Sequence, residues 1–436
     1  MTLNIFLIAF NYFLIGLLSL AGVTFTLFYK QSITLSPSEL VSLGMWTSLP
    51  WTIKIVFGSI IDNFLKSRKP YAYLGALLLF IGYQGFSNID LIKTNLTEWQ
   101  TLLALGFITQ LGVVLIDIVT DTFQVEAVSQ NHYEKVQYWS QVFQTIGLVV
   151  GAFFTGILAS RFQFQEVTSF ISFLSIPLAI STFFIKVTCR HIKPVQWKFL
   201  LQTLTIIPFL FIVSDFWLVL VMTLYVGWFI YKVCPLDKYF LLTMLGIFLF
   251  RVYPSVGPSG TWWAIDVLKF DAEFLGTLTL VARLSALIIL FLVGRFIIKG
   301  EIKKTLLTVT ILAFILSLPE LGLFFNVVPI EFSKIAFLGT VALDAPLTGI
   351  SMVILGILVA KFAPSSGRAT YMAVSASFMN LALMYGDYIS KGLNEVFVVS
   401  RGDYTQYGKL LASTIVLGTI LSIIGIILVR KKKRIK

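Results

Sequence analysis

The chain has 436 residues, of which 57% are hydrophobic and only 12% are charged, and its mean hydropathy is +0.90. A soluble domain carries about 25% charged residues, so this composition excludes an ordinary soluble protein and indicates a membrane protein. The formal net charge of +12 has the sign of a nucleic-acid-binding protein. The basic residues gather in loops between apolar runs, however, which is typical of membrane topology, and we expect no nucleic-acid partner.

Cysteine and histidine occur too rarely for a disulfide framework or a metal site. Cys189 and Cys234 fall near basic loops, and His132 and His191 lie in loops. The sequence also has no glycine-rich phosphate loop, zinc spacing or nucleophile motif. We therefore expect no metal, no cofactor and no enzymatic reaction, and we expect a site that binds and moves a solute.

The first predicted element is an apolar run over residues 4–29, which contains no Lys or Arg before Lys30. A signal peptide has a basic start, a shorter apolar core and a small-residue cleavage site, so we interpret this run as a retained membrane helix. With the runs that follow, the pattern predicts an all-α integral membrane protein of about fourteen spans. The further runs lie at 38–64, 71–89, 98–125, 137–160, 167–187, 199–214, 216–232, 239–266, 273–298, 304–326, 333–361, 369–393 and 408–429.

Basic residues follow alternate spans and predict the orientation of the chain. Lys66, Arg68 and Lys69 follow the second run, and the sequence ends in RKKKRIK. Basic loops also follow the runs that end at 187, 232, 298 and 361. The positive-inside rule makes all these loops cytoplasmic. We therefore expect a multi-pass protein of the plasma membrane, of the bacterial inner-membrane type, embedded in the lipid bilayer with both termini in the cytoplasm.

The runs divide into six, a short pair and six. This division predicts an N-terminal six-helix bundle over 1–188, a cytoplasmic link with an extra helix pair over 189–238, and a C-terminal six-helix bundle with a basic tail over 239–436. Two six-helix bundles are the layout of major-facilitator transporters, whose substrate sites lie at the bilayer midplane. The halves show no sequence repeat, so the symmetry is inferred from the span count, and we expect a monomer.

The stretch LIDIVTDTFQVE, which ends at Glu126, places three acids in or beside an apolar run. Asp117 and Asp121 are four residues apart, so they share one face of a helix. An acid near the bilayer centre costs about 2.5–3.5 kcal/mol on insertion scales, which makes it a candidate functional group. Lys54 lies at comparable depth in the second run. We therefore expect it to pair with one or both aspartates.

This charge cluster has two interpretations. It can be a static salt bridge that fixes helix packing, or one acid can exchange a proton as a transporter changes sides. Repulsion between neighbouring carboxylates favours a bound proton at one of them. Asp117 is the deepest acid and the first candidate for protonation, with protons as the coupling ion. Glu126 lies nearest the loop and is expected to anchor a helix end against a basic residue.

The second half has a run that is interrupted by two prolines and two glycines. Arg251 is followed by VYPSVGPSGTWW, which ends at Trp263. Such a sequence predicts a broken helix, and exposed backbone at membrane depth is tolerated only where it lines a cavity or is buried in protein. Arg251, Tyr253, Trp262 and Trp263 then become candidate substrate-binding residues. The alternative for both tryptophans is an interfacial position beside a kinked helix.

Other charges also lie inside the predicted spans of the second half. Arg283 is about ten residues into its run, and Asp344 is its best partner by depth, so both are candidate substrate-binding residues. Asp387 and Lys391 are four residues apart near the outer end of their run. We expect these two residues to pair with each other.

Five stretches of the chain match one known family pattern. They are LPWTIKIVFGSIID with the following SRKPY, LIDIVTDTFQVE, VYPSVGPSG, FDAEFLGTLTLV and APSSGRATYMAVSASFMNL. Together they resemble the folate–biopterin transporters within the major facilitator superfamily. The sequence departs from the family pattern at Ile55, where Pro is usual, at Ile61, where Ser is usual, and at Arg368, where an acid is frequent. The short pair over 199–232 is not part of the family's common core.

The first of these stretches also resembles the general facilitator signature between spans two and three, here Gly58, Asp62, Arg68 and Lys69. The resemblance implies a gate in which Asp62 faces Arg68 or Lys69, and Glu126 is assigned to the same end. It also implies a secondary transporter of a folate-like or pterin-like solute, imported with protons.

The residues leave other functions open. A different small anion, such as a metallophore, a muropeptide or a nucleotide-like compound, fits the same cations and aromatic rings. A membrane protein that shields a cofactor or assists assembly, without transport, is the alternative from another class.

Overall fold

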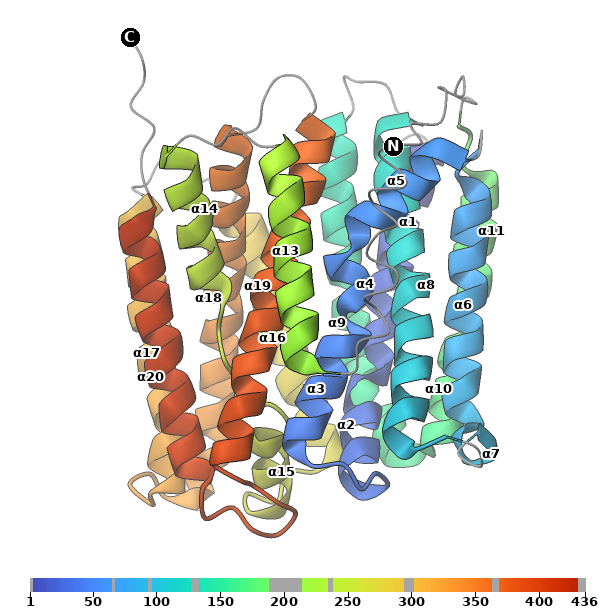
Figure 1. The fold of residues 1–436 in the computed structure, drawn as a ribbon. Helices are drawn as coiled ribbons and strands as arrows, with labels where there is room; N and C mark the ends of the chain where they lie inside the picture. Colours follow the sequence, from blue (N-terminus) through green and yellow to red (C-terminus); the bar gives the residue numbers. More distant parts are fainter. Residues whose placement is uncertain are drawn as a thin grey trace. The chain divides into compact units, whose positions relative to one another are not determined.

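The computed structural model describes residues 3–64, 67–92, 96–126, 133–187, 214–233, 238–293, 302–362 and 368–429. These residues are almost entirely helical (Figure 1). The β-type pairing found among them is the isolated bridge between Ser400 and Asp403. Eight helical stretches in the described part are long and apolar enough to cross a membrane. The predicted all-α membrane fold is confirmed, and the number of spans stays a prediction.

The chain divides into two compact units, and each unit contains a short segment from the other half of the sequence. Unit 1 holds the described residues within Met1–Leu35, Trp46–Thr205 and Asp271–Arg283, and unit 2 holds those within Ser36–Met45, Ile206–Phe270 and Leu284–Lys436. Two helices, over 37–47 and 272–293, therefore pass from one unit into the other. The predicted boundaries near 188 and 238 stay a prediction, because 188–213 and 234–237 lie outside the described residues.

Unit 1 contains the elements of the first six predicted spans, except for the start of the second, which lies within residues 36–45 of unit 2. Several of these spans are interrupted. The first span consists of α1, a 3-10 turn and α2, and the second continues from α3 into α4 and α5. The bounds are α1 Leu3–Leu17, η1 Leu18–Ala21, α2 Gly22–Gln31, α4 Leu49–Thr52, α5 Lys54–Phe64, α6 Lys69–Ser87, α7 Ile89–Ile92, α8 Glu98–Glu126, α9 Tyr133–Arg161, α10 Phe164–Ser172 and α11 Ser175–Phe184.

Close backbone packing fixes α8, which carries the predicted acids, against α6. A Cβ atom on Gly112 of α8 would lie 2.6 Å from the carbonyl oxygen of Gly75 on α6, so no larger side chain fits there. Membrane helices associate through such small-residue contacts, because lipid provides no hydrophobic drive between helices. The glycine pair therefore sets the position of α8 within unit 1.

The two ends of unit 1 are held by different polar contacts. Asn4 Nδ2 donates to the carbonyl of Lys186 at 3.0 Å, and Lys69 Nζ donates to the carbonyl of Phe183 at 2.7 Å. The start of α1, the start of α6 and the end of α11 thus meet at a basic end. At the opposite end, Thr34 donates to the carboxylate of Glu98. Because α1 begins at the end of unit 1 where α11 ends, the chain from α1 through α11 passes from one end of the unit to the other an even number of times.

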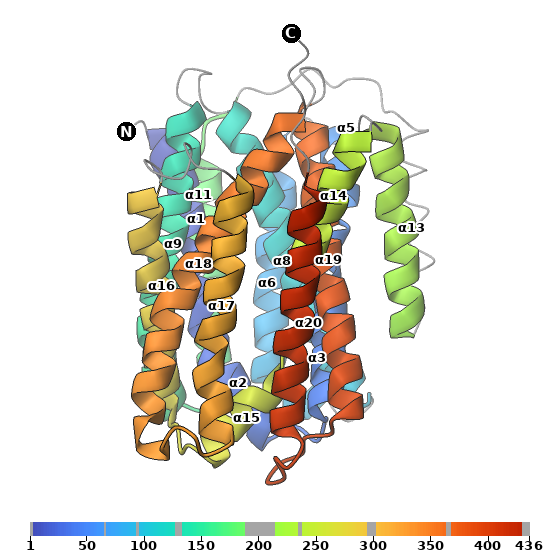
Figure 2. The same ribbon diagram turned by 90° about the vertical axis from the view of Figure 1, so that its left-hand side faces the viewer.

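In its described residues, unit 2 contains elements of the predicted C-terminal six-helix bundle, the segment 36–45 of the second predicted span, and one additional helix over residues 215–233. Figure 2 shows α20 beside α14 and α17, which it contacts. The bounds are α3 Pro37–Thr47, α13 Asp215–Val233, α14 Lys238–Arg251, α15 Pro258–Asp266, α16 Ala272–Val293, α17 Ile302–Phe324, η5 Ile330–Phe332, α18 Ser333–Phe362, α19 Arg368–Val396 and α20 Tyr407–Leu428.

The additional element is α13, which corresponds to the second helix of the predicted short pair. The first helix of that pair, over 199–214, lies outside the described residues except for Ser214. α13 packs along α19, and the hydroxyls of Thr223 and Tyr385 form a hydrogen bond of 2.8 Å between these two helices. The extra helix is thus joined to the bundle by a specific polar contact as well as by apolar side chains.

The predicted broken helix is confirmed. α14 ends at Arg251 and α15 begins at Pro258. Gly257 has φ 60° and ψ −141°, a conformation that residues with a Cβ atom rarely adopt. The opened backbone finds partners on α19: the Ser255 amide donates to Ser390 Oγ at 2.8 Å, and Asn394 Nδ2 donates to the Val256 carbonyl at 3.4 Å. The break is therefore stabilised inside protein, as membrane-depth backbone requires.

Candidate functional site

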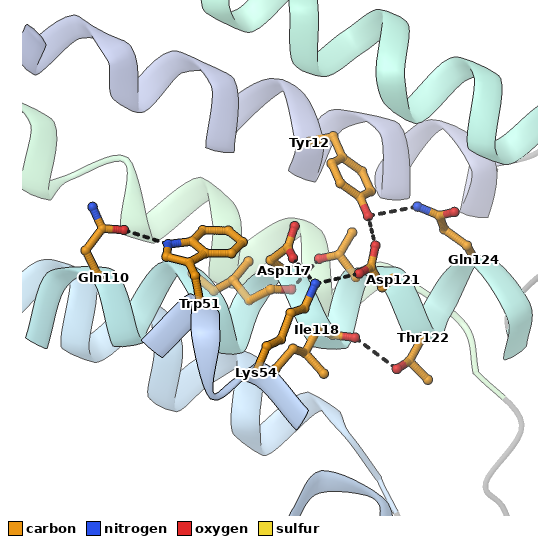
Figure 3. Close-up of polar contacts among 11 residues, drawn as sticks. Tyr12, Trp51, Lys54, Gln110, Asp117, Ile118, Asp121, Thr122 and Gln124 are labelled. Carbon is orange, nitrogen blue, oxygen red and sulfur yellow. Dashed lines mark hydrogen bonds and ion pairs between the residues drawn. The ribbon is translucent and has the colours of Figure 1, made fainter. Parts of the chain in front are cut away.

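A compact ion cluster in unit 1 contains the predicted lysine and both predicted aspartates. Lys54 is the first residue of α5, directly after the helix interruption at Ile53. Its Nζ atom lies 2.5 Å from Asp117 Oδ2 and 3.0 Å from Asp121 Oδ2 (Figure 3). The predicted pairing of Lys54 is confirmed, and it involves both acids. Whether one acid exchanges a proton stays a prediction.

The two acids occupy different environments although they lie one helical turn apart. The side chain of Asp117 is 10% exposed, whereas that of Asp121 is 50% exposed. Buried apolar residues pack around this part of α8, among them Val114 and Phe123. Asp117 therefore depends on Lys54 for its stabilisation, while Asp121 also has access to water.

Tyr12 of α1 completes the cluster and was not predicted from the sequence. Its hydroxyl donates a hydrogen bond to Asp121 Oδ1 and accepts one from Gln124 Nε2 at 2.8 Å (Figure 3). The signal that could have found it is the polar pair Asn11-Tyr12 inside an otherwise apolar first run. Tyr12 fixes Asp121 from the side opposite to Lys54, so the two acids are held by unequal sets of partners.

Trp51 adds an aromatic surface beside the ions and was also not predicted. Its indole Nε1 donates to Gln110 Oε1 at 3.0 Å, which fixes the ring against α8. Lys54 Nζ lies 5.9 Å from the centre of the Trp51 ring, within the range of a cation–π interaction. The cluster therefore brings together a cation, two carboxylates and an aromatic ring that is held in place by a hydrogen bond.

The predicted gating residues lie near the basic end of unit 1. A Cβ atom on Gly58 would meet nothing within 4 Å, so close packing does not require a glycine there. Arg68 is buried, and Lys69 Nζ binds the Phe183 carbonyl and lies 5.8 Å from the ring of the same residue. The side chains of Asp62 and Glu126 lie outside the described residues. The predicted contact of Asp62 with Arg68 or Lys69 stays a prediction.

In unit 2, the predicted substrate-binding residues surround the helix break but differ in exposure. Arg251 ends α14 and is half-buried, while Tyr253 lies in the break and is 48% exposed. The Tyr253 ring lies against Gly418 of α20, and its backbone lies against Gly386 of α19. The break therefore presents a partly accessible aromatic ring close to a cation.

The two predicted tryptophans belong to the packed interior of unit 2. Trp262 is 1% exposed and Trp263 is 2% exposed. The guanidinium of Arg401 lies 4.3 Å from the centre of the Trp262 ring, and Tyr407 stacks on Trp263 at 4.9 Å between ring centres. A face of each ring is thus covered by protein, and the role of both tryptophans in substrate binding stays a prediction.

Two further predicted intramembrane pairs have different outcomes. Arg283 is exposed in unit 1 and Asp344 is half-buried in unit 2, so their pairing stays a prediction. The predicted pair between Asp387 and Lys391 is wrong. Lys391 Nζ instead lies 2.7 Å from Asp215 Oδ2 and 3.1 Å from Glu395 Oε1, because α13 brings an acid to α19 that local spacing does not reveal.

Solved structures with the same fold are membrane transporters. The crystal structure of the nucleoside transporter NupG superposes with a TM-score of 0.67 at 13% identity, and the match covers 99% of this chain and 100% of NupG. The xylose transporter XylE from E. coli gives a TM-score of 0.64 at 12% identity, with 99% and 97% covered. At these identities the likeness shows the fold alone, which is of the major-facilitator type.

Sequence relatives and a family model identify the chain more closely. Folate transporter 2 of Plasmodium falciparum is 23% identical over 304 residues, which are 69% of this chain and 60% of that protein. The folate-biopterin transporter of Synechocystis sp. is 24% identical over 387 residues, which are 85% of this chain and 70% of that protein. The BT1 family model matches residues 16–435, and the chain therefore belongs to the BT1 family.

Proposed function

We propose that this protein is a secondary transporter that moves a small anionic, flat-ring solute of the folate or pterin class by alternating access, driven by protons. The observation that carries the proposal is the ion cluster of Lys54, Asp117 and Asp121 in a chain of the BT1 family. Relatives named as folate and folate-biopterin transporters support the substrate class. The membrane fold, shared with solved transporters, supports the mode of action.

The charges of the cluster support proton coupling. One lysine faces two carboxylates, so the cluster carries one excess negative charge when both acids are ionised, and a single bound proton balances it. Asp121 accepts hydrogen bonds from both Lys54 and Tyr12, and its side chain is half exposed. Asp117 is more deeply buried and has Lys54 as its described ionic partner. We therefore assign the exchanging proton to Asp117.

Residues at the ion cluster of unit 1 and at the helix break of unit 2 are of the kinds that bind a planar anion. Lys54 lies over the Trp51 ring and pairs a cation with an aromatic face. At the helix break the chain also supplies a cation, Arg251, and a partly exposed aromatic residue, Tyr253. Guanidinium and ammonium groups bind carboxylates, and aromatic rings stack on flat heterocycles. We keep Arg283 and Asp344 in the proposed substrate-binding set.

The orientation is proposed from the charges at the ends of the helices. Lys69 and Lys186 lie at the end of unit 1 where α1 begins, whereas Glu98 lies at the other end. With the basic end in the cytoplasm, the chain enters the plasma membrane from inside, and both termini are cytoplasmic. We propose that the transporter works as a monomer.

The experiment uses purified protein in proteoliposomes and compares two modes of transport. Asp117→Asn should abolish pH-gradient-driven accumulation of folate or a pterin but spare exchange of labelled for unlabelled substrate, because exchange needs no net proton movement. Asp90→Asn, which changes an acid of unit 1 outside the cluster, is the matched control and should leave both modes intact. Gradient-driven accumulation by Asp117→Asn would place the proton site elsewhere.

The substrate class is tested separately by thermal shift. Folate, pterins, muropeptides and metallophores are added to the purified wild-type protein, and the unfolding midpoint is recorded. A ligand at about one hundred times its Kd stabilises the folded state by about 2.7 kcal/mol, which gives a measurable shift. A shift with muropeptides or metallophores, and none with folate or pterins, would contradict the proposed substrate class while leaving proton coupling open.

A further inference from the structure

A second ionic cluster lies in unit 2 and involves none of the predicted site residues. Asp215 is the first residue of α13, and its Oδ2 atom lies 2.7 Å from Lys391 Nζ on α19. Ser42 of α3 donates to the same carboxylate, at 2.9 Å from Oδ1 and 3.0 Å from Oδ2. The Asp215 side chain is only 11% exposed. One carboxylate thus joins three helices of unit 2.

Docking of α13 alone does not account for this arrangement. An acid at a helix N-terminus is favourable by itself, and the pair with Lys391 would suffice to attach α13 to α19. Ser42, however, belongs to the segment 36–45, which is part of the second span and continues into unit 1 from Trp46 onward. The extra helix therefore contacts a segment that connects the two units through the chain.

The helix break holds the same segment at a second point. A Cβ atom on Gly257 would lie 2.8 Å from Val41 Cγ2, so Val41 packs directly against the break beside Ser42. Val41 is 8% exposed and Ser42 is 6% exposed. The segment is thus held at two neighbouring residues: Val41 packs against the break, and Ser42 binds Asp215.

Interruptions lie between this segment and the ion cluster of unit 1. α3 ends at Thr47, α4 begins at Leu49, and Ile53 leaves the helical conformation with φ −94° and ψ 19°. Lys54 follows immediately. Helix ends and short connections of this kind absorb the backbone rotations of conformational changes. Two helix interruptions, after Thr47 and at Ile53, therefore separate Ser42 from Lys54 within this span.

We propose that Ser42, Asp215 and Lys391 form a latch by which the extra helix α13 holds the segment 36–45 within unit 2. Opening the latch releases this segment from α13 and α19, and the state in which it is released becomes more populated. α13 then acts as a gating element of the transporter. The proposal goes beyond the proposed function, because it concerns a conformational equilibrium and holds whatever solute is carried.

The latch is tested by the labelling rate of a buried thiol. Cys189 and Cys234 are replaced by Ser, Val41→Cys provides the reporter, and the purified protein is treated with a maleimide. Asp215→Asn and Ser42→Ala should each increase the labelling rate by roughly tenfold, within the usual range of coupling between two sites. Ser42→Ala is the sharper test, because it leaves the ion pair between Asp215 and Lys391 in place.

Two controls separate the latch from a general loss of structure. Glu395→Gln removes the other acid that Lys391 contacts, which is 53% exposed and has no described contact with Ser42, so it should leave the rate unchanged. A second reporter, Leu79→Cys in the buried core of unit 1, should stay slow in every variant.

The outcomes decide the proposal without a transport assay. Faster labelling in both single variants, with slow labelling of the second reporter, supports the latch. Unchanged labelling in Ser42→Ala would show that Asp215 only attaches α13 to α19, and would overturn the latch proposal. Equal acceleration of both reporters indicates general loosening and also overturns it.

Discussion

The ion cluster of unit 1 and the helix break of unit 2 place polar groups inside a membrane protein in two different ways. In unit 1, α8 runs without interruption through the cluster, and Asp117 and Asp121 are stabilised by Lys54. In unit 2, the backbone itself is opened, and its amide and carbonyl groups are bound by the neutral side chains of Ser390 and Asn394.

The ion cluster contains groups that can change charge, whereas the side chains at the helix break only fix the backbone conformation. Hydroxyl and amide side chains keep the same charge at any physiological pH, so the hydrogen bonds at the break do not respond to protons. The carboxylates of the ion cluster can respond, because a proton changes their attraction to Lys54. The comparison predicts that disruption of the ions affects energy coupling, whereas disruption of the break affects the scaffold.

The largest effect is expected from Lys54→Met. This change removes the cation and leaves Asp117 buried without its described ionic partner, which should lower the free energy of unfolding by about 3–5 kcal/mol. Chemical or thermal unfolding of the purified protein measures the loss. Proton-driven uptake should be lost as well, since the cluster then lacks the cation that both carboxylates contact.

Partial rescue tests whether the loss comes from the ion pair. Lys54→Met combined with Asp117→Asn should be more stable than Lys54→Met alone, because no buried charge is then left uncompensated. Losses that add up in this double-mutant cycle would show that the two residues do not interact.

A smaller effect is expected from Gly257→Ala at the helix break. The positive φ of Gly257 strains a residue with a Cβ atom, and that atom would lie 2.8 Å from Val41 Cγ2. Strain of this kind costs about 1–3 kcal/mol. The unfolding midpoint should fall accordingly, while the pH dependence of uptake should match that of the wild type, because no titrating group is changed.

Gly392→Ala is the matched control in the same unit. A Cβ atom on Gly392 would meet nothing within 4 Å, and this residue lies inside α19, where Ala is a better helix former than Gly. This variant should be as stable as the wild type or more so. If both glycine variants behaved alike, the special conformation at Gly257 would not matter.

Local patterns in the sequence were sufficient to predict the features that depend on neighbours along the chain. The spacing of Asp117 and Asp121 placed both acids on one face of a helix, and the depth of Lys54 in its own span identified it as their partner. The prolines and glycines between Arg251 and Trp262 predicted the break in the same way. The all-α fold follows from the apolar runs alone.

Features that depend on which helices pack together could not be predicted. Tyr12 reaches Asp121 across more than one hundred positions in the sequence, and the Asn11-Tyr12 pair marks a polar position without indicating which helix supplies the partner. Lys391 was assigned to Asp387 by local spacing, yet α13 supplies Asp215 instead. Arg401, from a loop more than one hundred positions away, lies over the Trp262 ring, and no local pattern indicates this contact. In each case the deciding partner comes from another helix or loop.

The smallest effect is expected from Tyr12→Phe, and it sharpens the distinction between the two acids. The change removes the hydroxyl that donates to Asp121 and accepts from Gln124, and a single hydrogen bond of this kind contributes about 0.5–1.5 kcal/mol. Water can replace part of it, because the Asp121 side chain is half exposed. Unfolding of Tyr12→Phe, Asp121→Asn and the double variant measures the coupling between these side chains, and the combined loss should be smaller than the sum. Gradient-driven uptake should persist in Tyr12→Phe, since Asp117 keeps its contact with Lys54. Loss of coupled uptake in this variant would move the proton site from Asp117 to Asp121, because Asp121 is the acid that Tyr12 contacts.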